Sequence, residues 1–249
     1  SDTLSASPTA AVLSGGGFVA RVNGFGSVTA NCANGGTDTA TLQGSTGADT
    51  LSAYPKQVTL AGTGFSNQAK SFKSVVAVSN GGGDTANLYD SSGADTLNAY
   101  PAKSILYGSF TGGSYSNEAD GFRYVYAYAN SAGTDTAIFH DGTAADSFTG
   151  SASTPAAFMT DNSTYLNRDN YFEKVTASFS QGGKDAINLN DSAGSDRLDT
   201  DHTTAKLTSG ARFISLSELS ALAKVIATSS KCGADTKHAA VHDFVLQTV

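Results

Sequence analysis

The chain has 249 residues, a formal net charge of −7, 27 glycines, no tryptophan and only 15% charged residues. The acidic balance argues against a general nucleic-acid binder, which needs a basic surface to displace counterions. No apolar run approaches the roughly 18 residues of a membrane span, so neither nucleic acid nor membrane is expected as a partner. Few charges among many small polar residues are typical of secreted bacterial β-proteins, which predicts a secreted or cell-surface location.

An internal repeat of 46–51 residues organises the chain. One aspartate recurs at gaps of 46, 51, 50 and 50, at Asp38, Asp84, Asp135, Asp185 and Asp235. A second recurs in the same phase, at Asp49, Asp95, Asp146 and Asp196. We interpret the chain as one domain of five units, 4–50, 51–96, 97–147, 148–197 and 198–249. Because residues 1–4 already match the inside of a unit, we expect a monomer or a piece of a longer protein.

Each unit is predicted to contain four short strands. In the second unit these are residues 51–54, 58–61, 74–78 and 85–89, where small aliphatic residues alternate with polar ones. Alternation with period two indicates strands with one buried face. The joins are rich in glycine and asparagine, as tight corners require.

Stacking of the units predicts an all-β fold, a right-handed parallel β-helix with one coil per repeat and strands about 4.8 Å apart. A β-propeller with four-stranded blades is the alternative. An aspartate repeated at one corner favours the β-helix, because its carboxylate can bind backbone N–H groups from coil to coil. Ser215-Leu216-Ser217-Glu218 has the spacing of a capping box and predicts a short helical cap over residues 219–223 at the C-terminal end.

The two cysteines, Cys32 and Cys232, lie four units apart. Stacked coils would separate them by about 19 Å, whereas a disulfide needs Cα atoms within about 7 Å. The sequence therefore predicts free thiols.

The run GGGDTANLYDSSGADTL at residues 81–97 is similar to the Gly-Asp repeats of calcium-binding RTX proteins. Its aspartate spacing is 11 instead of nine and the second glycine of each turn is missing, which argues against RTX-type calcium stacks. The longer unit resembles tandem repeats of β-helix proteins among secreted bacterial polysaccharide-degrading enzymes and adhesins. That resemblance implies a polysaccharide partner and assigns no catalytic residue. No cofactor or catalytic metal is expected, and structural calcium is the one ion considered.

The third and fourth units depart most from the repeat and suggest a polysaccharide lyase acting on a uronate-containing chain. β-Elimination needs a cation for the sugar carboxylate, a base for the C5 proton and an acid for the leaving oxygen. We assign Arg123 or Lys174 as the cation, His140 or Tyr126 as the base and Tyr128 as the acid. Further substrate contacts are predicted for Lys73, Tyr89, Tyr100, Tyr124 and Asn190.

Each of these residues also has a structural interpretation. Tyrosine is a good strand former, and Tyr54 and Tyr100 are expected to stack on each other between successive units. Residues 111–118 and 161–170 are longer inserts that are expected to wall a groove. The even, low-charge rows equally suit a non-catalytic module for adhesion or glycan binding, which is the alternative function.

Overall fold

The computed structural model describes residues 1–219, 223–228, 235–239 and 245–248. These residues form 26 strands, and no helix occurs among them. Stacked coils build a β-solenoid, as the sequence predicts. The chain divides into two compact units: unit 1 comprises residues 1–95 and 102–133, and unit 2 comprises residues 96–101 and 134–249. No helix in the described residues is long and apolar enough to cross a membrane.

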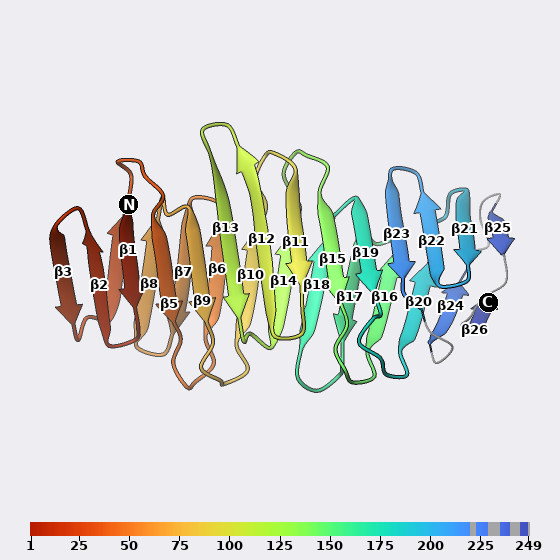
Figure 1. Ribbon diagram of the computed structural model, residues 1–249, viewed down its shortest axis with the longest axis horizontal. Coiled ribbons are helices and arrows are strands. Elements are labelled where there is room, and N and C mark those ends of the chain that lie inside the picture. The colour runs from red at the N-terminus through yellow and green to blue at the C-terminus, as the bar shows by residue number, and fades with distance from the viewer. Residues whose placement is uncertain (220–222, 229–234, 240–244, 249) are drawn as a thin grey trace. The chain divides into compact units, whose positions relative to one another are not determined.

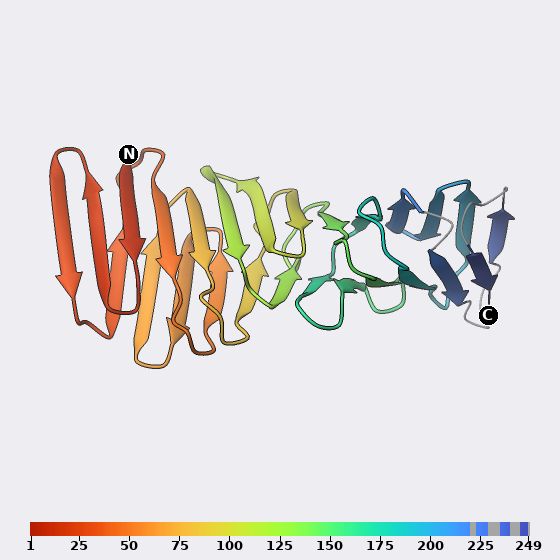
Figure 2. The same ribbon diagram turned by 60° about the horizontal axis from the view of Figure 1, so that its bottom comes forward.

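Unit 1 consists of two layers of strands (Figures 1 and 2). Sheet 1A has the order β12-β13-β9-β5-β1-β2-β3 and sheet 1B the order β14-β10-β6-β7-β8-β4. The strands of sheet 1A are β1 (Asp2–Ala6), β2 (Ala10–Gly15), β3 (Phe18–Asn23), β5 (Thr39–Gln43), β9 (Ser74–Val78), β12 (Lys103–Phe110) and β13 (Gly113–Asp120). Those of sheet 1B are β4 (Ser27–Asn31), β6 (Thr50–Tyr54), β7 (Gln57–Gly62), β8 (Phe65–Lys70), β10 (Thr85–Tyr89) and β14 (Tyr124–Tyr128).

Unit 2 repeats this plan. Sheet 2A has the order β25-β21-β22-β23-β19-β15-β11 and sheet 2B the order β26-β24-β20-β16-β17-β18. The strands of sheet 2A are β11 (Asp95–Ala99, whose first residue groups with unit 1), β15 (Thr136–His140), β19 (Lys174–Ser178), β21 (Asp196–Asp201), β22 (Thr204–Ser209), β23 (Arg212–Ser217) and β25 (Thr236–Ala239). Those of sheet 2B are β16 (Ser147–Ser151), β17 (Ala156–Thr160), β18 (Leu166–Asn170), β20 (Ala186–Asn190), β24 (Lys224–Thr228) and β26 (Val245–Thr248).

The path of one repeat differs from the predicted single coil. In unit 1 the chain forms a three-stranded antiparallel meander in sheet 1A (β1 to β3), crosses to β4 in sheet 1B and returns to β5. The next meander, β6 to β8, lies in sheet 1B. A repeat therefore has five strands rather than four and crosses between the sheets three times. The strands that join successive coils, such as β5 and β9, pair in parallel, which excludes propeller blades.

Small aliphatic residues fill the space between the two sheets of each unit, as the alternation predicts. In the second repeat, Leu51, Ala53, Val75, Ala77 and Leu88 are all buried. Strands β8, β13 and β18, the third strands of the three meanders after the first, each also bury an asparagine, which was not predicted from the sequence. The side-chain amides of Asn67 and Asn117 donate hydrogen bonds to main-chain carbonyls at the ends of β1 and β6, at 2.8 and 3.1 Å. A buried amide is tolerated because its polar atoms find main-chain partners.

The aspartates form the predicted corner ladder. The carboxylate of Asp84 accepts a hydrogen bond from the N–H of Asp49 at 2.7 Å, and Asp185 accepts one from Asp146 at 2.9 Å. The second aspartate of each pair then closes its own corner: Asp49 accepts the N–H of Ser45 at 2.5 Å. Each buried carboxylate thus satisfies backbone donors that the turn would otherwise leave unpaired.

The C-terminal end departs from expectation. Ser215, Leu216 and Ser217 belong to strand β23 rather than to a capping box, and residues 220–222 of the expected helix lie outside the described residues. Cys32 is a buried free thiol, as predicted, whereas Cys232 lies outside the described residues.

Candidate functional site

The outer surface of sheet 1B carries five tyrosines from three adjacent strands, which we call the tyrosine face. They are Tyr54 on β6, Tyr89 on β10, and Tyr124, Tyr126 and Tyr128 on β14. Their sequence neighbours on β14, Val125 and Ala127, are buried, so the alternate tyrosines point outward. Parallel pairing aligns Tyr89 with Tyr128 and places Tyr54 at the matching position of β6.

Three of these rings form a stack at one edge of the face. The ring centroids of Tyr54 and Tyr89 are 4.2 Å apart with an interplanar angle of 4°, and those of Tyr89 and Tyr128 are 5.2 Å apart at 14°. Burial, together with a hydrogen bond between the Tyr54 and Tyr89 side chains, raises the pKa of Tyr89, so this phenol is neutral at physiological pH. The predicted stacking of Tyr54 on Tyr100 is wrong, because β6 lies beside β10 of the same repeat in sheet 1B and Tyr54 therefore meets Tyr89.

The other two tyrosines have small neighbours. Tyr124 pairs with Thr85 and Tyr126 with Asn87 across the β14–β10 ladder. No aromatic side chain of β10 therefore covers these two rings, and both are partly exposed. Outward residues two apart on a strand are about 7 Å from each other. The guanidinium of Arg123 lies 5.3 Å from the ring centroid of Tyr124, within cation–π range.

The predicted catalytic residues are divided between the two units. Arg123, Tyr126 and Tyr128 lie on or next to β14 in unit 1, whereas His140 and Lys174 belong to unit 2. Within unit 2, Lys174 pairs with Thr136 at the start of β15 and His140 with Ser178 at the end of β19. Four residues of strand, about 13 Å, therefore separate the His140 and Lys174 positions. Unit 1 therefore contains a predicted cation, Arg123, a predicted base, Tyr126, and the predicted acid, Tyr128.

The remaining predicted contacts occupy three places. The ring of Tyr100 stacks on that of His140, with centroids 4.1 Å apart, and burial lowers the pKa of His140. Asn190 lies on sheet 2B, where it lines a pocket of about 300 Å³ with Phe158 and Arg168. Lys73 lies at the corner before β9, in unit 1.

No family model, curated protein or solved structure matches this chain. The candidate site is therefore defined by geometry. The tyrosine face unites four of the predicted residues, Tyr89, Tyr124, Tyr126 and Tyr128, on one sheet and adds Tyr54.

Two groups of side chains have metal-ligand spacing among the described residues: Asp2, Cys32 and Asp38, and Asp191, Asp196 and Asp235. Asp38 in the first group and Asp196 and Asp235 in the second accept backbone N–H groups at corners of the solenoid. Asp38 accepts the N–H of Asp2 at 2.5 Å, and Asp235 accepts the N–H of Asp196 at 3.0 Å. Their geometry is thus that of the other corners of the solenoid.

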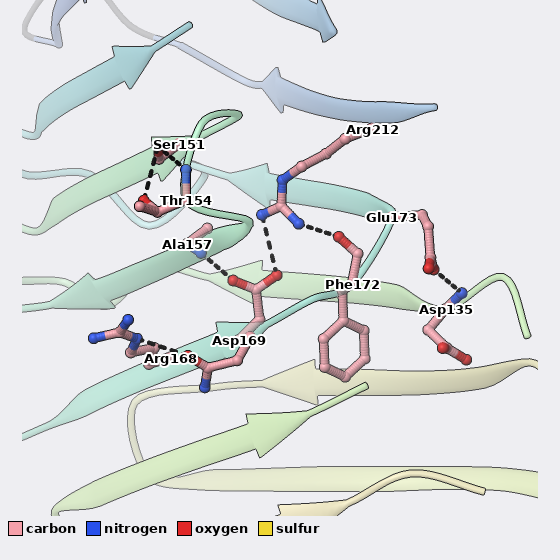
Figure 3. A network of polar contacts seen from close by, with 10 residues as sticks. Asp135, Ser151, Thr154, Ala157, Arg168, Asp169, Phe172, Glu173 and Arg212 are labelled. Carbon is pink, nitrogen blue, oxygen red and sulfur yellow. Dashed lines mark hydrogen bonds and ion pairs between the residues drawn. The ribbon is translucent and has the colours of Figure 1, made fainter. Parts of the chain in front are cut away.

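One buried ion pair interrupts the repeat in unit 2 (Figure 3). Asp169 on β18 is fully buried, and its carboxylate lies 3.5 Å from a guanidinium nitrogen of Arg212 on β23. The same carboxylate accepts the N–H of Ala157, and Arg212 also donates to the main-chain oxygen of Phe172. Burial raises the pKa of Asp169 to about 7, against the opposing effect of Arg212. The pair is closed to solvent and is a packing feature of the core.

The signal for this pair was present in the repeat. Asp169 stands where the two preceding repeats have Ala69 and Ala119, each 50 residues apart. The strand register places Arg212 on β23 at the position of Tyr115 on β13. Two charges at inward positions of neighbouring coils indicate a buried pair, because a lone buried charge is rarely tolerated.

Proposed function

We propose that unit 1 is a non-catalytic module that binds a polysaccharide chain on the tyrosine face. The observation that carries the proposal is the register of five tyrosines on three adjacent strands of one sheet. In keeping with its composition, the protein would meet this ligand outside the cell.

The chemistry of the face suits sugars. Aromatic rings offer an apolar surface to the C–H faces of pyranose rings, while phenol hydroxyls and side-chain amides bond to their hydroxyl groups. Tyr124 and Tyr126 supply the ring faces that no β10 aromatic covers, and the stacked Tyr54, Tyr89 and Tyr128 supply a row of phenol edges and hydroxyls. Both come from a hydrogen-bonded sheet, so little conformational entropy is lost when a ligand binds.

The test is affinity electrophoresis of the wild type and variants through gels containing neutral and acidic polysaccharides. Tyr124→Ala combined with Tyr126→Ala should weaken binding at least about tenfold, since aromatic anchors each contribute about 1 kcal/mol or more. Tyr107→Ala is the matched control, because Tyr107 is an exposed tyrosine (40%) on β12 in the other sheet of unit 1. The proposal would be overturned if no polysaccharide gel retarded the wild type. It would also be overturned if the double variant were retarded as strongly as the wild type.

The same samples distinguish binding from cleavage. A lyase would release unsaturated uronate, which absorbs in the ultraviolet, and Tyr126→Phe would abolish that signal while keeping the aromatic ring. We expect no unsaturated product and unchanged binding for Tyr126→Phe. Product that depends on the Tyr126 hydroxyl would instead make β14 the catalytic strand of a lyase.

A further inference from the structure

A basic groove runs along the corner of unit 1 where β6 and β8 end and β9 and β13 begin. It has a volume of about 600 Å³. Lys56, Lys73 and Phe110 line it, together with Gly112 in the exposed turn before β13 and Gly113 at the start of that strand. This turn is the first part of the insert that the sequence analysis expected to wall a groove; the rest of that insert forms strand β13.

The groove is positively charged within an acidic protein. Among the residues that the structure describes, no carboxylate lines it, and residues 50–83 contain three lysines but no aspartate or glutamate. The ammonium group of Lys56 lies 4.8 Å from the ring centroid of Phe110. Neither Lys56 nor Lys73 forms an ion pair within the part of the chain that the structure describes. Two exposed ammonium groups are thus available to an anion.

The groove is next to the tyrosine face along the chain, because Pro55 and Lys56 line it. Tyr54, the outer ring of the stack, is followed directly by Pro55 and Lys56, which form the turn between β6 and β7. Across the ladder, Tyr54 pairs with Gln57, and Gln57 pairs with Lys70. A ligand lying along Tyr128, Tyr89 and Tyr54 would therefore meet a third lysine on the sheet and the groove at its edge.

We infer that this groove binds the carboxylate or sulfate groups of an acidic polysaccharide whose chain lies on the tyrosine face, an inference that rests on the proposed function. Lysine ammonium groups pair with such anions as point charges. The contacts are solvent-exposed, so their contribution falls as salt screens them. The groove sets the charge preference, and the tyrosines bind the sugar rings.

The experiment compares polymers that differ only in charge: polygalacturonan with its carboxyl-reduced form, and dextran sulfate with dextran. The variant is Lys56→Ala with Lys73→Ala, both at exposed positions. Lys103→Ala is the control, because it removes the same charge from β12, about 20 Å along the strand from the groove. Lys56→Arg with Lys73→Arg retains the charge.

We expect the alanine double variant to bind its acidic polymer about tenfold more weakly, with neutral binding unchanged and a smaller dependence on salt. The arginine variant and Lys103→Ala should bind as the wild type does. A preference for polygalacturonan identifies carboxylate as the ligand group, and a preference for dextran sulfate identifies sulfate.

Equal wild-type binding of charged and neutral polymers would overturn the inference and leave the tyrosine face intact as a glycan site. Unchanged binding of the acidic polymer by the alanine variant would also overturn it. If the wild type binds none of the polymers, the proposed function itself is wrong. Circular dichroism of each variant confirms that the fold is retained.

Discussion

Replacement of Asp169 by alanine tests how the core of unit 2 tolerates charge. The substitution leaves Arg212 buried, with its Nε atom already lacking a hydrogen-bond partner. Removal of one member of a buried ion pair costs about 3–5 kcal/mol, because the other charge remains desolvated and unpaired. We therefore expect Asp169→Ala to lower the free energy of unfolding of unit 2 by about that amount.

The repeat itself supplies the compensating change. Adding Arg212→Phe to Asp169→Ala recreates an alanine on one meander and an aromatic residue on the next, the arrangement at the equivalent positions Ala69 and Tyr115. Replacing a buried ion pair with packed apolar residues is often neutral or stabilising by 1–4 kcal/mol. The double variant should consequently be at least as stable as the wild type.

A pH series provides an independent readout. The pKa of Asp169 is about 7 in the folded protein, against an ordinary value of about 3.9, so the native state holds a proton that the unfolded chain releases. Stability contributed by this group is therefore fully present below about pH 4 and is lost as pH rises through 7. The difference in stability between wild type and the double variant should follow that trend.

Urea unfolding followed by far-ultraviolet circular dichroism measures the stability of four proteins: the wild type, Asp169→Ala, Arg212→Phe and the double variant. If Asp169→Ala is as stable as the wild type, or if the double variant is no more stable than Asp169→Ala alone, an unpaired Arg212 does not destabilise this core. A difference between wild type and double variant that does not vary between pH 4 and 7 would refute the pKa assignment.

Three further predictions concern unit 1. A Cβ on Gly62 would lie 1.7 Å from Oδ1 of Asp49, so Gly62→Ala should destabilise by about 2 kcal/mol, whereas Gly26→Ala, with its nearest atom at 3.4 Å, should be neutral in the same urea titration. Asp84→Ala removes the acceptor for the Asp49 N–H and should cost about 1–3 kcal/mol, while Asp84→Asn keeps Oδ1 and most of the stability; equal losses would contradict the ladder. Burial, followed by the charges of Asp38 and Asp2, raises the pKa of Cys32 to about 11. Iodoacetamide at pH 8 should thus modify Cys32 slowly, and peptide mass spectrometry showing fast alkylation of the native protein would contradict this.

The strands were predictable where inward residues are apolar. Residues 85–89 alternate polar and apolar residues, and residues 74–78 have apolar residues at both inward positions. These segments form β10 and β9 with the expected bounds. Strand β8 was missed because Asn67 takes an inward position and breaks the apolar pattern. Asparagines at residues 67, 117 and 167 keep a 50-residue spacing, however, and such a period at a polar residue signals a buried, bonded amide.

The number of sheets could not be obtained from alternation. Period two reports which side of a strand is buried, but it does not tell which of two facing sheets the strand joins. The 11 residues from Asp84 to Asp95 are too few for a whole coil. In the structure they contain β10 of sheet 1B and lead to β11 of sheet 2A. The predicted rows on β9 and β14 therefore face opposite ways, and the tyrosine face had to be assembled from β6, β10 and β14.

Because each repeat crosses between the sheets three times, an odd number, successive meanders lie in alternate sheets. In unit 1 the first meander belongs to sheet 1A and the second to sheet 1B, so equivalent residues of consecutive repeats emerge on alternate sides. Duplication of one repeat would turn every later side chain to the reverse side, whereas duplication of two would preserve its direction. A surface that must stay aligned along a growing array can therefore lengthen only in pairs of repeats.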